Sequence, residues 1–241
     1  MAPGAPSRGP AGEEASVIEL ADAAYGYGGG ELLSDMTLRL APGSFHFLTG
    51  PSGAGKTTFL KLCYMELRPR RGTVRVLGRD VAGMSRDDIA AARRRIGIVH
   101  QDCRFLDHLP LHENVALPLT VAGRDMAAEA DNLDELLGWV GLAGRRDALP
   151  PELSGGERQR AALARAVVMS PDVILADEPT GNIDWEMSER LMTLLCELNR
   201  MGKTVLVATH DLTLIRSVKN RVAARVLRIA KGRLHLAGAD L

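Results

Sequence analysis

The stretch FLTGPSGAGKTT, at residues 47–58, decides the fold of this chain. Residues 50–57 match the spacing G-x-x-x-x-G-K-[ST], in which a glycine-rich loop joins a buried strand to a helix. The flanks agree, because residues 45–49 read as a short buried strand and residues 56–64 as the helix that follows. Glycines let backbone N–H groups converge on phosphate oxygens, and a helix N-terminus adds partial positive charge. The loop therefore predicts a nucleotide-phosphate site.

Within this loop, Lys56 is expected to neutralise the β- and γ-phosphates and Thr57 to offer its hydroxyl to Mg²⁺. A glycine turn before a core helix is the structural alternative, and the full match between a strand and a helix disfavours it. Thr58 is expected to add a hydrogen bond to phosphate. The predicted nucleotide ligands are Gly50, Pro51, Ser52, Gly53, Ala54, Gly55, Lys56, Thr57 and Thr58.

Hydrophobic patterning predicts further strands on both sides of the loop. Two of them, VILA and TVLVAT, are separated by a helix with a leucine at residues 191, 194, 195 and 198, which is the βαβ pattern of a parallel sheet. The first two strands of the chain are expected to pair as an antiparallel hairpin. The predicted strands are residues 17–20, 37–40, 45–49, 73–78, 96–99, 173–176, 204–209, 222–229 and 233–236.

The remaining segments complete an α/β domain. Ser85 and Asp88 resemble a capping box that opens a helix ending at Arg94. Residues 104–169 contain no convincing strand, and apolar residues at 133, 136, 137 and 140 recur at helical spacing, so we expect a helical subdomain there. Residues 1–15, rich in Pro, Gly and Ala, are predicted to be a flexible tail before a single domain at 16–241.

The run VILADE delivers two carboxylates, Asp177 and Glu178, to the carboxyl end of a predicted strand. Ligands of open α/β sheets gather at that edge. Asp177 is expected to hold Mg²⁺ through water, and Glu178 to polarise the water that attacks the γ-phosphate. Alone, such a pair would read as a solvated acidic turn, but beside a phosphate loop the catalytic interpretation is favoured.

The run LSGGERQR, residues 153–160, predicts a second anion site at a helix start, with exposed N–H groups at Ser154, Gly155 and Gly156. Together, the phosphate loop, LSGGE, VILADE and His210 resemble the motifs of ATP-binding cassette ATPases, in the family order and over about residues 17–236. The resemblance implies a P-loop NTPase fold with a mainly parallel sheet, an antiparallel β subdomain and a helical subdomain. It also implies Mg²⁺-dependent ATP hydrolysis.

In that family two subunits pack head to tail, so the resemblance implies an ATP-dependent homodimer. Ser154 and Gly156, within a signature motif that also includes Gly155 and Glu157, would then touch γ-phosphate held by the other copy. The further residues that the resemblance assigns are Gln101 as a Mg²⁺-sensing residue, Asp184 as the loop aspartate that couples the two sites, and His210 as a contact of γ-phosphate. Without the resemblance, Gln101 reads as a surface glutamine and His210 as a structural histidine.

An aromatic ring is expected to stack on adenine, and Tyr25 and Tyr27 compete for this role. Tyr27 fits the family spacing better, while core packing is the alternative for either ring.

The run LADEPTGNID resembles the branch of the family that serves cell division, lipoprotein release and macrolide-type export. The division members are the most similar, and they imply an integral membrane FtsX-like partner, control of cell-wall hydrolases, and a peripheral place on the cytoplasmic side of the bacterial inner membrane. Ile183, where leucine is usual, and Trp185 depart from the pattern. Export or lipoprotein release is the alternative, and a soluble cassette acting on nucleic acid is a weaker one.

Composition agrees with this assignment. Of the 241 residues, 46% are hydrophobic and 25% charged, which excludes a wholly disordered chain. Thirty basic and thirty acidic residues give no net charge, so no nucleic-acid partner is expected. The longest uncharged stretch, residues 40–55, is broken by Pro and Gly and is not expected to span a membrane. Three cysteines without metal-ligand spacing, Cys63, Cys103 and Cys196, fit a reducing compartment.

The sequence alone leaves the roles of two sets of residues undecided. Five leucines and valines after Gln101 would either line a groove for the membrane partner or form ordinary core, and they are Leu106, Leu109, Leu111, Val115 and Leu117. The basic clusters at residues 68–71 and 93–95 read as solvated helix and loop faces rather than as membrane or nucleic-acid contacts.

Overall fold

The computed structural model describes residues 16–28, 30–181 and 183–237. The predicted tail at residues 1–15 lies outside this part of the chain. No helix of the described part combines the length and the apolar character that crossing a bilayer requires.

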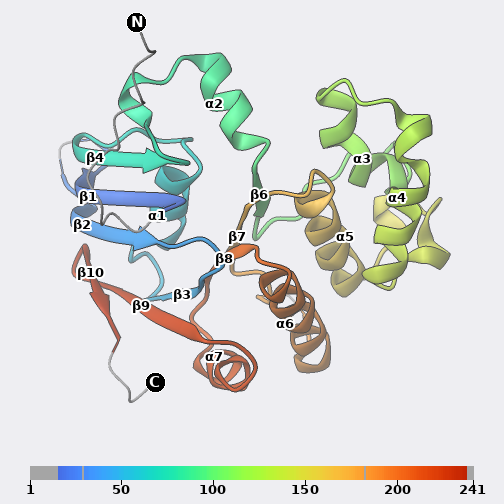
Figure 1. Ribbon diagram of the computed structural model, residues 1–241. Coiled ribbons are helices and arrows are strands. Elements are labelled where there is room, and N and C mark those ends of the chain that lie inside the picture. The colour runs from blue at the N-terminus through green and yellow to red at the C-terminus, as the bar shows by residue number, and fades with distance from the viewer. Residues whose placement is uncertain (1–15, 29, 182, 238–241) are drawn as a thin grey trace, which may run out of the picture.

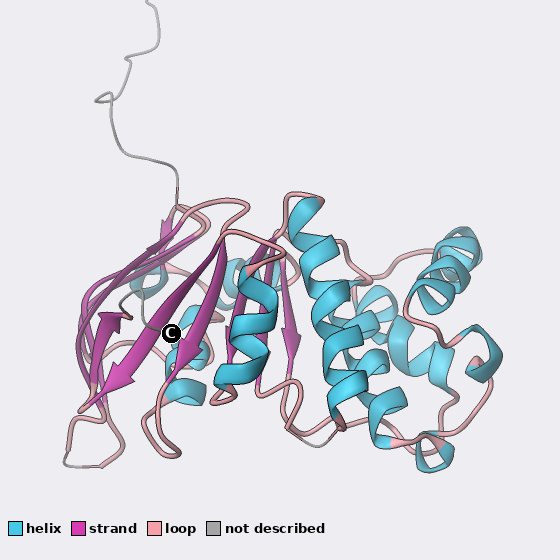
Figure 2. Ribbon diagram, turned by 90° about the horizontal axis from the view of Figure 1, so that it is seen from below, coloured by secondary structure: helices cyan, strands magenta, loops and turns pink. Residues whose placement is uncertain are grey.

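The centre of the fold is a six-stranded sheet in the order β10-β9-β3-β8-β7-β6 (Figure 1), and Figure 2 shows its strands with helices packed beside them. Its strands are β3 (Phe45–Thr49), β6 (Ile96–Val99), β7 (Val173–Asp177), β8 (Thr204–Ala208), β9 (Ala224–Ala230) and β10 (Arg233–Leu236). All neighbours are parallel except β10, which pairs with β9 as an antiparallel hairpin. Every residue of β3, β7 and β8 is buried, in keeping with their continuous apolar runs.

A second sheet, antiparallel and four-stranded, has the order β2-β1-β4-β5. It contains β1 (Ile18–Tyr25), β2 (Leu33–Leu40), β4 (Arg71–Val76) and β5 (Arg79–Asp80). The predicted hairpin of the first two strands is confirmed, with both strands longer than predicted. The two-residue β5 and the short 3-10 turn η1 (Val81–Gly83) were not predicted, because neither is long enough to show a periodic pattern.

Helix α1 (Lys56–Cys63) shares one hydrophobic core with the antiparallel sheet and one face of the central sheet. The other face of the central sheet packs on α5 (Gly155–Val167), α6 (Trp185–Arg200) and α7 (Leu212–Lys219). Helix α2 (Arg86–Arg93) begins with the predicted capping box, in which Ser85 and Asp88 bond reciprocally. Helix α7 was not predicted.

Only helical elements lie between β6 and β7 in the described chain. These are α3 (Leu111–Val121), α4 (Met126–Trp139), α5 and the 3-10 turns η2 (Ala143–Arg145) and η3 (Pro150–Glu152). They pack around a third core, to the right in Figure 1. Leu111 and Val115 are fully buried there, so the interpretation of these two as a groove for a partner was wrong. Leu109 and Leu117 are half-buried, and Leu106 is exposed.

A fully buried amide fixes the loop that enters this helical segment. The Asn114 side chain donates to the carbonyls of Leu106, Leu109 and Pro110 at 3.0, 2.8 and 3.3 Å, and it accepts from the Leu106 N–H at 2.8 Å. The carbonyls of Leu106 and Pro110 also accept a backbone N–H, whereas within the described chain the Leu109 carbonyl and the Leu106 N–H bond to this amide alone.

We predict that Asn114→Ala lowers the free energy of unfolding by about 1 to 3 kcal/mol, because it leaves the Leu109 carbonyl and the Leu106 N–H without a partner. Urea denaturation followed by circular dichroism measures this effect. The control is Asn132→Ala, on the exposed face of α4, which should change stability by less than about 0.5 kcal/mol. Equal effects of the two substitutions would contradict the role of Asn114.

Candidate functional site

The loop at residues 50–55 joins the carboxyl end of β3 to the start of α1. Two of its glycines have no room for a side chain. Gly50 has φ 156° and a Cβ there would lie 2.7 Å from the Ile229 carbonyl, while Gly55 has φ 99° and a Cβ there would lie 2.7 Å from Leu33. No side chain caps the first turn of α1, so its N–H groups remain available to an anion.

The loop borders a cavity of about 700 Å³, a size that suits a nucleotide. Most of the predicted nucleotide and metal ligands line it together. The lining residues are Leu32, Pro51, Ser52, Gly53, Ala54, Gly55, Lys56, Thr57, Thr58, Gln101, Asp177, Glu178, Gly181 and His210. Leu32 and Gly181 were not singled out from the sequence, since neither carries chemistry that a motif would mark.

Lys56 is buried at the base of this cavity. Its ammonium donates to the Gly50 carbonyl at 3.0 Å and forms an ion pair with the Glu178 carboxylate at 3.3 Å. A buried cation needs such partners, because the protein interior solvates charge poorly. The arrangement keeps a positive charge at the point where the loop can present it to a phosphate.

Asp177 ends β7 and is also buried. Burial raises the pKa of its carboxyl above the ordinary value, and a hydrogen bond from the Thr57 hydroxyl opposes that rise. One carboxylate oxygen, Oδ1, is enclosed without any hydrogen-bond partner. An unpartnered buried carboxylate oxygen is costly, and it is a good ligand for a hard cation such as Mg²⁺.

Glu178 follows Asp177 with φ 44°, in the left-handed region that a non-glycine residue rarely adopts. Its N–H donates to the Ala208 carbonyl at 2.8 Å, which fixes this turn against β8. The Glu178 carboxylate lies 3.0 Å from Nδ1 of His210, whose ring is otherwise exposed. Glu178 therefore joins Lys56 to His210 across the floor of the cavity.

Gln101 lies just after β6 and reaches the same cavity. The loop that it begins is fastened to α5, because the Cys103 thiol donates to the Gln159 side chain at 2.6 Å. Arg165 donates to the Arg104 carbonyl at 2.6 Å, and its guanidinium stacks 4.6 Å above the ring of Phe105. Sequence reasoning missed Gln159 and Arg165, since only the fold brings α5 beside this loop.

The signature residues do not line the cavity. Ser154 caps α5, accepting from the Glu157 N–H at 3.2 Å, and the Glu157 carboxylate accepts from the Ser154 N–H at 2.8 Å. Gly156 lies against α6, where an added Cβ would be 2.7 Å from the Met187 side chain. Asp184 caps α6 by accepting from the Met187 N–H at 2.9 Å. Because Gly156 also meets Met187, α5 and α6 begin side by side.

The two tyrosines differ in burial. Tyr25 is half-buried and packs against the core that α1 shares, whereas the side chain of Tyr27 is 58% exposed. Their rings meet edge to face with centroids 5.2 Å apart. Neither ring lines the cavity, and Tyr27 is the more exposed of the two.

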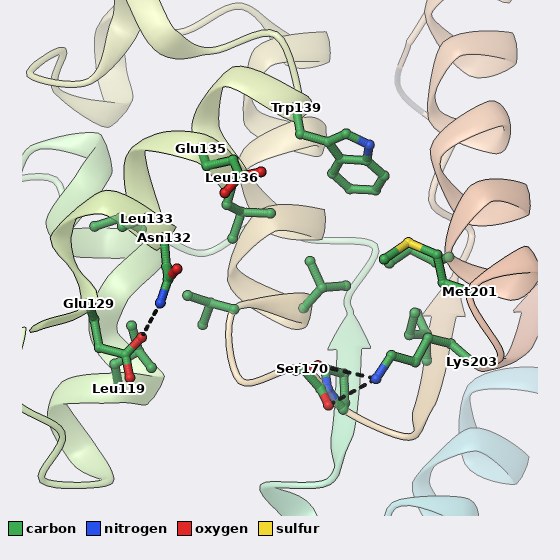
Figure 3. Close-up of a pocket in the computed structure, with 15 residues that line it drawn as sticks. Leu119, Glu129, Asn132, Leu133, Glu135, Leu136, Trp139, Ser170, Met201 and Lys203 are labelled. Atoms are coloured by element: carbon green, nitrogen blue, oxygen red, sulfur yellow. Dashed lines mark hydrogen bonds between the residues drawn. The ribbon is translucent and has the colours of Figure 1, made fainter.

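A second cavity, of about 490 Å³, lies away from these residues, between α4, α5 and the end of α6 (Figure 3). Leu133, Leu136 and Trp139 line one side, and Met201 and Lys203 the other. None of the predicted site residues borders it. Among the described residues, no cluster of three or more His, Cys, Asp or Glu side chains could hold a metal ion by itself.

Comparison with known proteins agrees with this geometry. A family model described as "ABC transporter" matches residues 33–181. The cell division ATP-binding protein FtsE of Escherichia coli (strain K12) is 43% identical over 209 residues, covering 86% of this chain and 92% of that protein. FtsE of Bacillus subtilis (strain 168) is 39% identical with the same coverage.

Among solved structures, the dimeric post-hydrolysis state of the ATP-binding cassette MJ0796 bound to ADP and Pi superimposes with a TM-score of 0.81. It is 31% identical and covers 92% of this chain and 99% of that one. The two-sheet architecture with its helical segment is thus the ABC ATPase fold. The chain belongs to the ABC transporter family and is an ATP hydrolase of the ABC type.

Proposed function

We propose that two copies of this chain enclose ATP head to tail, hydrolyse it with Mg²⁺, and thereby drive an FtsX-like membrane partner that regulates cell-wall hydrolysis during division. The main support for this proposal is that the two groups of residues expected at one ATP site lie apart within a single chain. Lys56, Glu178 and His210 line an open cavity, while Ser154 and the start of α5 lie outside it. The dimer of MJ0796 and the FtsE relatives support this arrangement.

In this proposal the phosphates bind residues 50–58, with Lys56 turning from Glu178 toward the β- and γ-phosphates and Tyr27 stacking on adenine. Ser154, Gly155, Gly156 and Glu157 of one copy approach the γ-phosphate held by the other. Asp184, at the start of α6 beside Gly156, links the two sites of the dimer. Residues 104–169 act as a subdomain that carries the signature motif, on the domain formed by residues 16–241.

Glu178 is positioned to orient and deprotonate the attacking water once ATP has drawn Lys56 away. Its strained backbone and its contact with His210 fix the carboxylate at the cavity floor. His210 then contacts the γ-phosphate, where a hydrogen-bond donor stabilises the charge that develops. These groups act by positioning and electrostatics, which supply most of the catalysis in phosphoryl transfer.

Thr57, Asp177 and Gln101 fit a Mg²⁺ site. The Oδ1 atom of Asp177 is buried without a partner, and the hydroxyl of Thr57 already lies at the same carboxylate. Gln101 borders the cavity from the other side. When bound, Mg²⁺ would neutralise charge on the β- and γ-phosphate oxygens.

A groove of about 330 Å³ between α2, α3 and α5 suits the membrane partner. It combines the arginines 93, 94 and 165 with an apolar rim that includes Val121, whose side chain is 79% exposed. An acidic and apolar segment of the partner would complement it. Arg165 lines the groove and also holds the Arg104 carbonyl, so docking would reach Gln101 through the intervening loop.

The FtsE relatives favour the division role, and with it a peripheral place on the cytoplasmic side of the bacterial inner membrane. Export of macrolide-type compounds or lipoprotein release would use the same ATPase cycle with another membrane partner. Co-purification from membranes followed by mass spectrometry distinguishes these roles. Recovery of an FtsX-like protein supports the proposal, and recovery of an export or lipoprotein-release permease contradicts it.

Glu178→Gln tests the catalytic assignment. It should lower the rate of ATP hydrolysis by about 100-fold or more, since it removes the base that orients water, while ATP binding persists. Steady-state phosphate release and equilibrium binding of labelled ATP measure the two effects. The control is Glu186→Gln on the exposed first turn of α6, which should keep the wild-type rate. A Glu178→Gln variant as fast as the control would refute the role.

Asp177→Asn tests the metal site in two measurements, which are the stability of the nucleotide-free chain and the Mg²⁺ dependence of ATP binding. Because its pKa is raised in the folded chain, Asp177 favours folding only below the ordinary carboxyl pKa, and this contribution is lost as pH rises through the raised value. Asparagine cannot ionise, so the nucleotide-free variant should be more stable than wild type at pH 8, with a gap that shrinks toward pH 4. Urea midpoints at the two pH values measure it.

The same Asp177→Asn variant should lose the strengthening of ATP binding by Mg²⁺ that wild type shows, as measured by titration of labelled ATP with and without the ion. Asp131→Asn, an exposed aspartate on α4, is the control for both measurements. Wild-type stability at pH 8 together with unchanged Mg²⁺ dependence would exclude Asp177 as the ligand.

Val121→Asp tests the partner groove. It places a negative charge in the position proposed to face an acidic segment, so the membrane partner should no longer co-purify while ATPase activity of the isolated chain is retained. Met201→Asp, an equally exposed apolar position beside the cavity of Figure 3, is the matched control and should keep the partner. Loss of the partner in the Met201 variant alone would move the docking site to that second cavity.

A further inference from the structure

A cavity of about 410 Å³ opens between the two sheets, away from the nucleotide cavity. It is bounded by the end of β2, the start of β3 and β9, and the end of β10. The phosphate loop leaves β3 at the opposite end of that strand. The lining residues are Thr37, Leu38, Arg39, His46, Arg225, Leu227, Leu234, His235 and Leu236, and none of them lines the ATP cavity.

His46 is the innermost polar group of this cavity. Only 2% of its surface is exposed, and Nδ1 has no hydrogen-bond partner. Buried side-chain nitrogens in native proteins nearly always have a partner, so an orphan of this kind indicates a missing one. Burial and the nearby Arg225 lower the pKa of His46 to about 4, so its ring is neutral near pH 7 and offers one hydrogen bond without adding charge.

The charge of the cavity is positive. Arg225 is directly opposite His46 in the parallel pairing of β3 and β9, and its side chain is exposed. Within the described residues, the Arg225 guanidinium has no hydrogen bond or ion pair, whereas Arg39 is neutralised by Glu19 at 2.9 Å. An unpaired guanidinium next to an unpartnered imidazole is a receptor for a single anionic group.

The remaining wall is apolar. Leu38 and Leu234 pack at the rim of the core that includes Leu227. Leu234 and Leu236 share one face of β10, because side chains two residues apart in a strand point the same way. Leu236 is 75% exposed at the mouth. A ligand that met these residues would bury apolar surface beside its charged end.

We propose that this cavity binds a small soluble anion with an apolar body, a medium-chain carboxylate or alkyl phosphate. The anionic group pairs with Arg225, and the His46 ring, whose Nδ1 is enclosed in the free protein, turns to donate a hydrogen bond to it. The alkyl chain of the ligand lies along Leu38, Leu227 and Leu236. The volume is within the range of small-molecule sites, and the site is independent of the ATPase assignment because it shares no residue with the ATP cavity.

Isothermal titration of the full chain, kept saturated with ADP so that the phosphate loop is occupied, with octanoate, octyl phosphate and inorganic phosphate tests the site. Octanoate or octyl phosphate should bind with 1:1 stoichiometry, and the tighter of the two identifies the head group. Inorganic phosphate should bind at least tenfold more weakly, since it lacks the apolar body. If inorganic phosphate binds as tightly as octyl phosphate, or if neither amphiphile binds, the proposal is overturned.

Two variants locate the binding. Arg225→Gln and His46→Phe should each weaken the amphiphile by about tenfold, since the first removes the charge and the second the buried nitrogen at similar volume. Arg228→Gln, another exposed arginine of β9 that does not line the cavity, is the control and should bind as wild type does. Equal affinity of the Arg225 and Arg228 variants would place the ligand elsewhere, and circular dichroism checks that each variant folds.

Discussion

The ion pair between the buried Lys56 ammonium and the Glu178 carboxylate organises the whole site. A charge enclosed at the base of a cavity has to be balanced, and here the balance comes from the carboxylate proposed to act on the attacking water, together with the Gly50 carbonyl. The glycines at positions 50 and 55 allow the loop to approach the core closely enough to do this. In the proposed cycle a phosphate replaces Glu178 at Lys56, which frees the carboxylate for water.

Direct side-chain contacts connect the nucleotide cavity to the helical segment between β6 and β7. Gln101 borders the cavity, and the next few residues are held by Gln159 and Arg165 of α5. The same helix begins at Ser154. A displacement of the loop at Gln101 is thus passed to a helix whose two ends lie at the proposed dimer contact and at the proposed partner groove. A rigid helix is a suitable element for such coupling.

Much of this could be predicted because it depends on local pattern. The continuous apolar runs of β3, β6 and β7 have almost the bounds that periodicity indicated, and Ser85 and Asp88 cap α2 as their spacing suggests. What was missed depends on tertiary contacts. Leu111 and Val115 look like a groove beside Gln101 until α4 and α5 cover them. The contacts of Arg165 and the unpartnered nitrogen of His46 have no sequence signal, because each arises between segments that are far apart in the chain.

The most direct test of the account is the mass of the Glu178→Gln chain in solution, measured by light scattering with Mg²⁺ and ATP. Nucleotide enclosed between the loop of one copy and the α5 start of another should double the mass relative to the nucleotide-free chain, and removal of ATP should reverse it. A mass of one chain at every protein and ATP concentration, with nucleotide demonstrably bound, would contradict the central claim.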